Sequence, residues 1–221
     1  RVSLGGRLHR NRGNNLFTNV TAGLPVLSGG IAAWADYDGD GWADVLVCGL
    51  AGGSARCQLY RNLGTDTFTN VTTAGFPDIY RGMGAWLDFD TDGRLDVVLS
   101  GETGPGVRTT GLYRNHGNGT FSLVNSGLPP TTYAWLATGD YDNDGRTDVA
   151  LSGANGTNNF SRIFRALPNG LFAADQSYLP TNSSSPLAWG EAEGDGRLDL
   201  VAAVVQAGQP RIGVFRNDEI L

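Results

Sequence analysis

A nine-residue acidic segment recurs along this chain at an almost constant interval, and this repeat restricts the possible folds more than any other feature. Its third acidic residue is Asp40, Asp92, Asp144 or Asp195, and successive copies are 52, 52 and 51 residues apart. A fixed period of this length is typical of proteins that stack one structural unit several times. The four copies are DYDGDGWAD (36–44), DFDTDGRLD (88–96), DYDNDGRTD (140–148) and EAEGDGRLD (191–199).

A second marker keeps the same period and lies between the acidic segments. It is a short stretch that ends in Arg-Asn in four of its five copies, such as LYRN at 112–115, and in the first four copies a turn and an aromatic residue follow it. The repeat therefore extends over nearly the whole chain. The marker ends at Asn11, Asn62, Asn115, Ala166 and Asn217, and the aromatic residues after the first four copies are Phe17, Phe68, Phe121 and Phe172.

One period has the pattern of four short strands. In the second period we expect them over 84–90, 95–101, 109–115 and 119–125, with turn-forming residues between them. The second of these is a continuous apolar run, as in a strand that is buried on both faces. No window has a convincing helical period, and the 33 glycines fit many tight turns. Four strands per period predict an all-β fold, a β-propeller of four-stranded blades.

These motifs resemble the FG-GAP or VCBS repeat. The resemblance rests on the D-x-D-x-D-G-x-x-D turn, on the apolar strand after it, and on the LYRN-x-G-x-G-x-F element, complete at 112–121. Repeats of this family build integrin-α-like propellers and many secreted ones, so the resemblance implies a propeller that binds calcium. It implies less about biological role, because these repeats serve many functions.

The sequence leaves the number of blades open. We expect residues 1–221 to form one propeller or propeller region, with about four to five blades present. A closed four-bladed ring, a five-bladed ring with an incomplete blade, and a segment of a larger propeller all fit the repeat count. We favour an incomplete or partial propeller, because the sequence begins and ends within a repeat.

Each acidic segment has the pattern of a calcium-binding turn. Its four carboxylates repel one another, at roughly 1 kcal/mol for each exposed pair near 4 Å, and a cation would offset that repulsion. Alternating side chains direct three carboxylates to one centre, glycine at the sixth position permits the bend, the seventh residue offers its carbonyl, and the ninth closes the shell. The turns contain no His or Cys, which disfavours zinc, and Mg²⁺ demands a stricter geometry. The expected ligands are Asp36, Asp38, Asp40, Trp42, Asp44, Asp88, Asp90, Asp92, Arg94, Asp96, Asp140, Asp142, Asp144, Arg146, Asp148, Glu191, Glu193, Asp195, Arg197 and Asp199.

The four turns are not equivalent as metal sites. A single acidic turn of this kind is also explained by a solvated hairpin, because Asp and Gly favour turns in any case. Three matching turns in register favour three bound Ca²⁺ ions. In the last turn, Glu191 and Glu193 replace aspartates and their extra methylene groups crowd the centre, so occupancy of a fourth site is left open. The ion is expected to be structural and to tie the first strand of each blade to the second.

Arginine and tryptophan recur with the same period. The arginines form either a ring of anion contacts or, in the interpretation we favour, side chains that pack over strand edges and bond turn carbonyls. Trp34, Trp86 and Trp189 lie two residues before an acidic turn, whereas Trp135 lies five before its own. For these we favour packing between blades over stacking on sugars. The recurring arginines are Arg10, Arg61, Arg114, Arg165 and Arg216.

The two cysteines and the sequons indicate a secreted or cell-surface protein. An antiparallel hairpin would bring Cys48 and Cys57 together, so we expect a disulfide rather than two buried thiols. Millimolar calcium outside cells agrees with this setting. Several of six N-x-S/T sequons are glycosylated if the source is eukaryotic; they begin at Asn19, Asn70, Asn118, Asn155, Asn159 and Asn182.

The sequence excludes several classes of function. It has no basic run with interleaved aromatic residues, as a nucleic-acid-binding surface would have, and no apolar stretch long enough to span a membrane. His9 lies at a strand position and His116 in a turn, and no Ser-His-Asp or Cys-His set is apparent. We therefore expect a protein that is not an enzyme.

Two functions remain, an adhesion or interaction module with structural calcium and a lectin that binds glycans. The ligand would be a protein or a glycan, bound between blades or at the face opposite the acidic turns. The loops expected there join second to third strands (49–57, 101–109 and 153–160) and fourth to first strands (74–82, 127–133 and 178–187), and they vary most between repeats. The candidate exposed aromatic residues are Tyr80, Tyr133 and Tyr178. The sequence does not indicate the oligomeric state.

Overall fold

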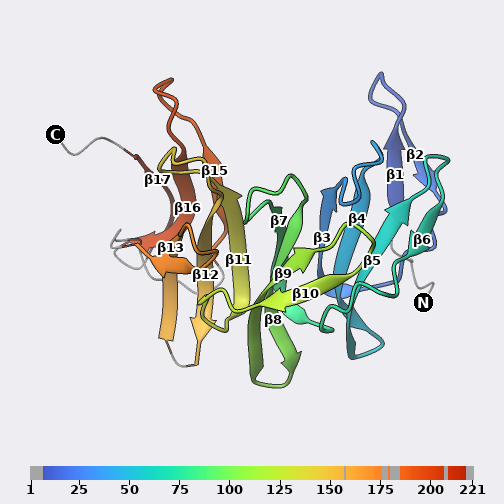
Figure 1. Ribbon diagram of the computed structural model, residues 1–221, viewed down its shortest axis with the longest axis horizontal. Coiled ribbons are helices and arrows are strands. Elements are labelled where there is room, and N and C mark those ends of the chain that lie inside the picture. Colours follow the sequence, from blue (N-terminus) through green and yellow to red (C-terminus); the bar gives the residue numbers. More distant parts are fainter. Residues whose placement is uncertain (1–6, 157, 176–178, 180–184, 207–208, 218–221) are drawn as a thin grey trace.

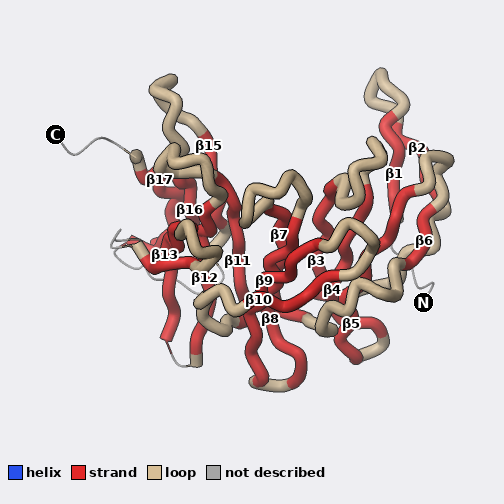
Figure 2. Tube along the Cα trace, in the orientation of Figure 1, coloured by secondary structure: helices blue, strands red, loops and turns tan. Residues whose placement is uncertain are grey.

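The computed structural model describes residues 7–156, 158–175, 179, 185–206 and 209–217. Within these residues the chain consists of strands and turns, with no helix (Figure 2). All ladders are antiparallel, and consecutive strands of the chain pair with one another. The expected all-β class is confirmed.

Three complete four-stranded blades form the middle of the molecule, one for each complete acidic turn. The first holds β3 (Ser28–Ala35), β4 (Asp44–Ala51), β5 (Ser54–Asn62) and β6 (Phe68–Asn70). The second holds β7 (Tyr80–Leu87), β8 (Asp96–Gly104), β9 (Val107–Asn115) and β10 (Phe121–Val124). The third holds β11 (Thr132–Gly139), β12 (Asp148–Asn155), β13 (Asn158–Ala166) and β14 (Phe172–Ala174).

Smaller sheets stand at the two ends of the blade series. The N-terminal sheet pairs β1 (Leu8–Asn11) with β2 (Phe17–Val20), and the C-terminal sheet holds β15 (Leu187–Gly190), β16 (Asp199–Gln206) and β17 (Gln209–Phe215). Figure 1 shows these sheets at opposite ends of the molecule, with the complete blades between them in chain order. The described residues therefore form an open series of blades and not the closed four-bladed ring that the sequence also allowed.

The second strand of each blade is the most deeply buried element. Val97, Val98 and Leu99 of β8 have no exposed surface, and the matching residues of β4 and β12 are almost as fully covered. These strands are apolar on both faces because each blade packs on two neighbours, so side chains on either face enter a core between blades. One such core joins Leu46 and Leu59 of the first blade to Val97 and Leu99 of the second.

Aromatic stacking next to the acidic turns also joins neighbouring blades. Trp86 stacks on Tyr37 of the preceding blade with ring centroids 6.5 Å apart, and its indole Nε1 donates to the Ala33 carbonyl at 3.4 Å. Trp189 repeats this arrangement on Tyr141, at 5.9 Å. Trp34 is different, because it is 49% exposed and has its ring contact with Phe68 of its own blade. Packing between blades is thus observed for Trp86 and Trp189, whereas Trp34 lines a groove with Leu8 and Val20 of the N-terminal sheet.

The connections between second and third strands differ from the expected loops. The segments 49–57, 101–109 and 153–160 are mostly strand, because β4 and β5, β8 and β9, and β12 and β13 continue to tight hairpin turns. The sequence differences between repeats in these segments therefore lie at the ends of paired strands. They do not lie in long loops, as had been expected. The connections between fourth and first strands are longer, and most of the segment 178–187 lies outside the described residues.

Cys48 and Cys57 face each other directly in the β4–β5 ladder and are joined by a disulfide, with an S–S distance of 2.06 Å. The next blade places Ser100 and Thr110 at the same pair of positions, where their hydroxyl groups lie 2.8 Å apart. The disulfide is therefore a covalent form of a cross-strand contact that the second blade makes with a hydrogen bond.

Candidate metal centres

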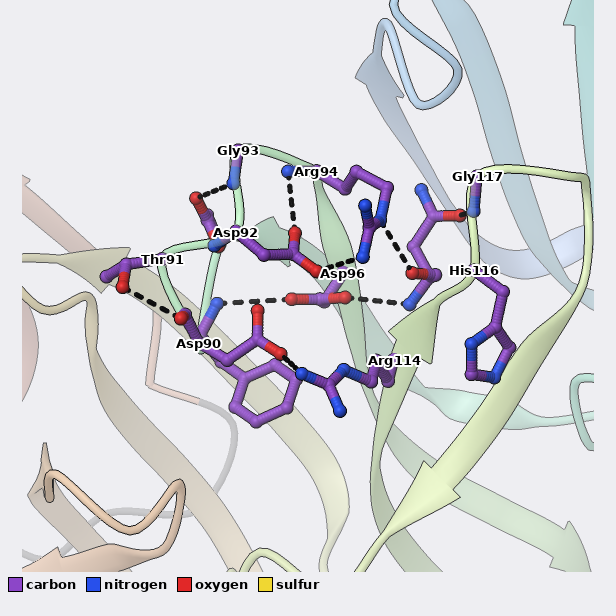
Figure 3. A network of polar contacts seen from close by, with 12 residues as sticks. Asp90, Thr91, Asp92, Gly93, Arg94, Asp96, Arg114, His116 and Gly117 are labelled. Atoms are coloured by element: carbon purple, nitrogen blue, oxygen red, sulfur yellow. Dashed lines mark hydrogen bonds and ion pairs between the residues drawn. The ribbon is translucent and has the colours of Figure 1, made fainter.

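Each acidic turn folds around its own first carboxylate. In the turn 88–96, Asp88 accepts backbone hydrogen bonds from Asp92 (3.1 Å) and Gly93 (2.9 Å), and Asp92 Oδ1 accepts one from Arg94 (2.9 Å). Gly93 has a φ of 84°, a left-handed conformation that glycine adopts at little cost. The turns at 36–44 and 140–148 repeat the same bonds. The spacing of Asp and Gly thus produces a turn that gathers carboxylates on one side (Figure 3).

The ninth residue of each turn is a buried carboxylate that joins three parts of a blade. Asp96, the first residue of β8, accepts from the backbone N–H of Phe89 in the turn (3.2 Å) and of Asn115 at the end of β9 (2.7 Å). Burial raises the pKa of Asp96 to about 6, because those two hydrogen bonds offset only part of the cost of removing the charge from water. Burial likewise raises the pKa values of Asp44 and Asp148 to about 6.

Three acidic turns bring carboxylate oxygens close enough to share one cation. One oxygen from each member of a cluster lies within 4.8 Å of the others, and the clusters are Asp36, Asp38 and Asp40, then Asp88, Asp90 and Asp96, then Asp140, Asp142 and Asp148. Among the described residues, Asp38 Oδ1 and Asp90 Oδ1 are buried with no hydrogen-bond partner. A buried oxygen without a partner is costly unless something else binds it. The donor set is all oxygen, and it fits a hard divalent cation.

Arginines of the third strands also reach these turns, which the sequence interpretation missed. Arg61 Nε lies 2.6 Å from Asp38 Oδ2, and Arg61 Nη2 donates to Asp40 Oδ2 at 2.8 Å. Arg114 pairs with Asp90, as Figure 3 shows, and Arg165 lies 3.7 Å from Asp142. The favoured interpretation, bonding to turn carbonyls, is therefore wrong for these residues. The signal in the sequence is the nearly constant distance of 21 or 22 residues from the fifth turn residue to the arginine, which places both in one repeat but does not show that they meet.

The side chains at the seventh turn position take the role that had been expected of the third-strand arginines. Arg94 Nε donates to the Asn115 carbonyl at 3.1 Å, and Arg146 Nε donates to the Ala166 carbonyl at 3.1 Å. Trp42 is half exposed and covers Gly64. That the backbone carbonyls of Trp42, Arg94, Arg146 and Arg197 are metal ligands stays a prediction.

The last turn, 191–199, has a different arrangement. One oxygen of Glu191 accepts from the backbone N–H groups of Glu193 (2.8 Å), Gly194 and Asp195 (3.3 Å), so the longer side chain folds back over the turn. Glu193 Oε1 lies 2.5 Å from Arg216 Nε. Among the described residues, only the first three turns form a cluster of acidic oxygens close enough for one ion.

The candidate tyrosines, histidines and sequon asparagines differ in how exposed they are. Tyr133 is 44% exposed, Tyr80 is partly buried, and Tyr178 lies outside the described residues. His9 and His116 are exposed, and the His116 ring lies 2.9 Å from the Ser122 hydroxyl. The asparagines of the sequons at 19, 70, 118, 155 and 159 are exposed, and position 182 is not described.

Comparison with known families agrees with the repeat. A model of the FG-GAP-like repeat matches residues 36–99, 88–151 and 140–202, which together cover most of the chain. The chain belongs to the FG-GAP-like repeat family. The overlapping matches each begin at one acidic turn and end within the second strand of the next sheet, so each match includes two acidic turns.

Two individual proteins are similar over much of this FG-GAP-like chain. Cartilage acidic protein 1 of Xenopus tropicalis is 25% identical over 181 residues, which is 73% of this chain and 27% of that protein. A solved structure of an Agrocybe aegerita lectin, described as recognising non-reducing terminal N-acetylglucosamine, aligns with a TM-score of 0.59 and 19% identity, over 90% of this chain and 55% of its own. This likeness shows the propeller fold. The chain spans about a quarter of the first protein and about half of the second. The described residues include no apolar helix of membrane-spanning length.

Proposed function

We propose that this chain is a calcium-stabilised propeller module that binds a protein or glycan partner and has no catalytic role. The observation that carries the calcium assignment is the set of three acidic turns, each with carboxylate oxygens within 4.8 Å of one another. Six to eight oxygen ligands suit Ca²⁺, and the nine-residue turn supplies carboxylates in a flexible arrangement. Asp36, Asp88 and Asp140 open these turns, and the ninth residues Asp44, Asp96 and Asp148 complete them.

The ion would contribute to folding and not to chemistry. The unfolded chain has no assembled site, so binding adds about 2.7 kcal/mol per site when calcium stands at a hundred times its dissociation constant. Metal analysis after dialysis should find three Ca²⁺ per chain, and EDTA should lower the melting temperature. Protein without calcium whose melting temperature EDTA leaves unchanged would refute the assignment.

A secreted or cell-surface location is part of the proposal. It is supported by the Cys48–Cys57 disulfide, which persists in oxidising compartments, and by the exposure of each described sequon asparagine. Mass spectrometry of the protein from its native source should find no free thiol and should find glycans on some of these asparagines. Two alkylatable thiols would contradict the location.

Glycan binding is the second candidate function. The lectin with the same fold supports it, as does the exposed ring of Tyr133 beside a groove between the blades. A glycan array probed in calcium would discriminate this function from protein adhesion. Reproducible binding to a defined set of glycans favours a lectin, whereas a blank array combined with capture of a cell-surface protein favours the adhesion module.

A further inference from the structure

One polar cluster in this repeat protein is not repeated. It lies where the first strands of the second and third blades begin, at the end of the blade away from the acidic turns. Tyr80 and Glu102 face each other across the β7–β8 ladder, and the first blade has Ser28 and Leu50 at the same pair of positions. A difference between repeats that otherwise share their contacts indicates a specific role. The Arg81 cluster, as we call it, consists of Tyr80, Arg81, Glu102, Thr132 and Tyr133.

The backbone of the cluster is held in an unfavourable conformation. Arg81 and Tyr133 lie at register irregularities of β7 and β11, and each has a φ of 51°. The first blade has Gly29 at the same point, with a φ of 55°. Side chains other than glycine are uncommon in this conformation and occur often at ligand-binding sites. The second and third blades thus carry a large side chain where glycine would suit the backbone better.

The guanidinium of Arg81 is held in place but is only partly used. Its Cζ lies 5.3 Å from the centroid of the Tyr80 ring and 5.4 Å from that of Tyr133. Its Nη1 is 3.5 Å from Glu102 Oε2, and its side chain is 49% exposed. A guanidinium has five N–H donors, and Glu102 is its one recorded acceptor among the described residues. Its other donors make no hydrogen bond among the residues that the structure describes.

Glu102 is the buried member of the cluster. It is 4% exposed and accepts a hydrogen bond of 2.7 Å from the Thr132 hydroxyl. Burial alone would raise the pKa of Glu102, but the hydrogen bonds from Thr132 and Tyr80 and the charge of Arg81 hold that pKa below its ordinary value. An ionised, buried carboxylate therefore fixes the position of Arg81 and joins the second blade to the third.

The cluster borders an apolar groove. The groove has a volume of about 370 Å³ and is lined by residues 29–33 of the first blade, 81–84 of the second and 133–135 of the third. Small and apolar residues form most of this lining, while Arg81 and Tyr133 contribute polar groups. This combination of an apolar wall with a few fixed polar groups is typical of small-ligand sites.

We propose that this groove binds an acidic sugar, whose carboxylate pairs with Arg81 and whose ring lies on Tyr133. This inference rests on the glycan-binding candidate above and names its ligand class. The planar fork of a guanidinium matches a carboxylate in two parallel hydrogen bonds, and an exposed aromatic face suits the apolar face of a sugar ring. Tyr80 and Thr132 do not line the groove; their hydroxyl groups bond Glu102 and so help to hold Arg81 in place.

Calorimetric titration with glucuronate, glucose and cyclohexanecarboxylate tests the proposal in calcium-loaded protein. Glucuronate should bind, and the neutral sugar and the ring without hydroxyl groups should each bind about tenfold more weakly or not at all. Arg81→Gly should weaken glucuronate by about tenfold or more, because a charged pair is lost. Relief of the backbone at φ 51° and loss of the charge beside Glu102 act in opposite directions on stability, so the melting temperature of the variant is measured to show that it is folded.

Arg56→Gln is the matched control. Arg56 is 47% exposed and lies 3.5 Å from Asp78, as Arg81 does from Glu102, but it is outside the groove. Its replacement should leave glucuronate binding unchanged. Absence of glucuronate binding at millimolar concentration, equal binding of glucose or cyclohexanecarboxylate, or equal effects of the two arginine variants would each overturn the proposal. Calcium binding is measured separately, so a protein that binds three Ca²⁺ and no glucuronate refutes this inference alone.

Discussion

The acidic turn of the second blade and that of the C-terminal sheet share their last five residues, DGRLD, and the bonds of their ninth residue, but they differ in the arrangement of their acidic oxygens. Asp96 and Asp199 each accept two backbone N–H groups, from Phe89 and Asn115 in one case and from Ala192 and Asn217 in the other. The pKa of Asp96 is raised to about 6 by burial, whereas the same kind of hydrogen bonds lower the pKa of Asp199. The ninth carboxylates of the two turns therefore accept matching backbone hydrogen bonds but lie in different electrostatic environments.

The two pKa values differ because burial outweighs the backbone hydrogen bonds at Asp96 but not at Asp199. The difference as a cation site lies in the first two acidic positions of the turn. Asp88 binds two amides with both of its oxygens, and Asp90 is left with one buried oxygen that has no partner. Glu191 reaches further, so a single oxygen takes three amides, and Glu193 meets Arg216. One added methylene at each position thus accompanies the change from a turn with a buried, unpartnered carboxylate oxygen to one whose acidic side chains bond within the chain.

The largest expected effect separates the two turns by mutation. Asp90→Ala should lower the free energy of unfolding by about 2.7 kcal/mol when calcium stands at a hundred times its dissociation constant, because Asp90 belongs to the cluster of acidic oxygens and one bound ion is lost. Glu193→Ala should cost much less, because little calcium binding is at stake in its turn. Melting curves in millimolar calcium and in EDTA measure both, and equal losses for the two variants would remove the distinction between the turns.

The reverse test restores aspartate at the first two acidic positions of the turn 191–199. Glu191→Asp combined with Glu193→Asp should create a fourth calcium site and stabilise the protein by about 1.4 kcal/mol at ten times the new dissociation constant. The shorter side chains free the oxygens that now fold back on the turn. Equilibrium dialysis should show one additional Ca²⁺ per chain. An unchanged stoichiometry would show that the glutamates are not what disables this turn.

The pH dependence of the calcium-free protein should also distinguish the turns. The folded pKa of Asp96 lies above its unfolded value of 3.8, so the folded state binds more protons between pH 3.8 and about 6. Stability should therefore rise by about 1 kcal/mol for this residue as pH falls from 7 to 5. Asp199 has a lowered pKa and should give no such rise. Denaturation of Asp96→Asn and Asp199→Asn across this range measures the difference. The first variant alone should reduce the rise, to which Asp44 and Asp148 also contribute.

The smallest expected effect concerns the arginine partners. Arg114 pairs with Asp90 on the surface of the second blade. In EDTA, Arg114→Gln should therefore lower the free energy of unfolding by about 0.5 kcal/mol. It should tighten calcium binding severalfold, because a positive charge next to the ion is removed. Arg216→Gln serves as the control and should leave calcium binding unchanged. Calcium titration showing weaker binding in Arg114→Gln would indicate that the arginine supports the site.

Local features of this protein were predictable from its sequence. The acidic turns are contiguous, so the alternation of Asp, the glycine at the sixth position and the substitutions at Glu191 and Glu193 directly indicate how the turns fold and which of them differs. The apolar runs that became β4, β8 and β12 were readable for the same reason, because burial on both faces removes the polar alternation of a half-exposed strand.

Contacts between strands that are distant in the chain were decided only by the tertiary structure. The period did not show that Arg61 and Arg114 turn toward the acidic carboxylates, or that Trp34 lacks the neighbour that covers Trp86. It also gave no sign that Arg81 and Glu102 of one blade meet Thr132 and Tyr133 of the next. A repeat pattern records what each unit does within itself, whereas the groups that meet between units depend on how the blades are rotated and packed, and that arrangement is set by the summed burial of side chains from all of them.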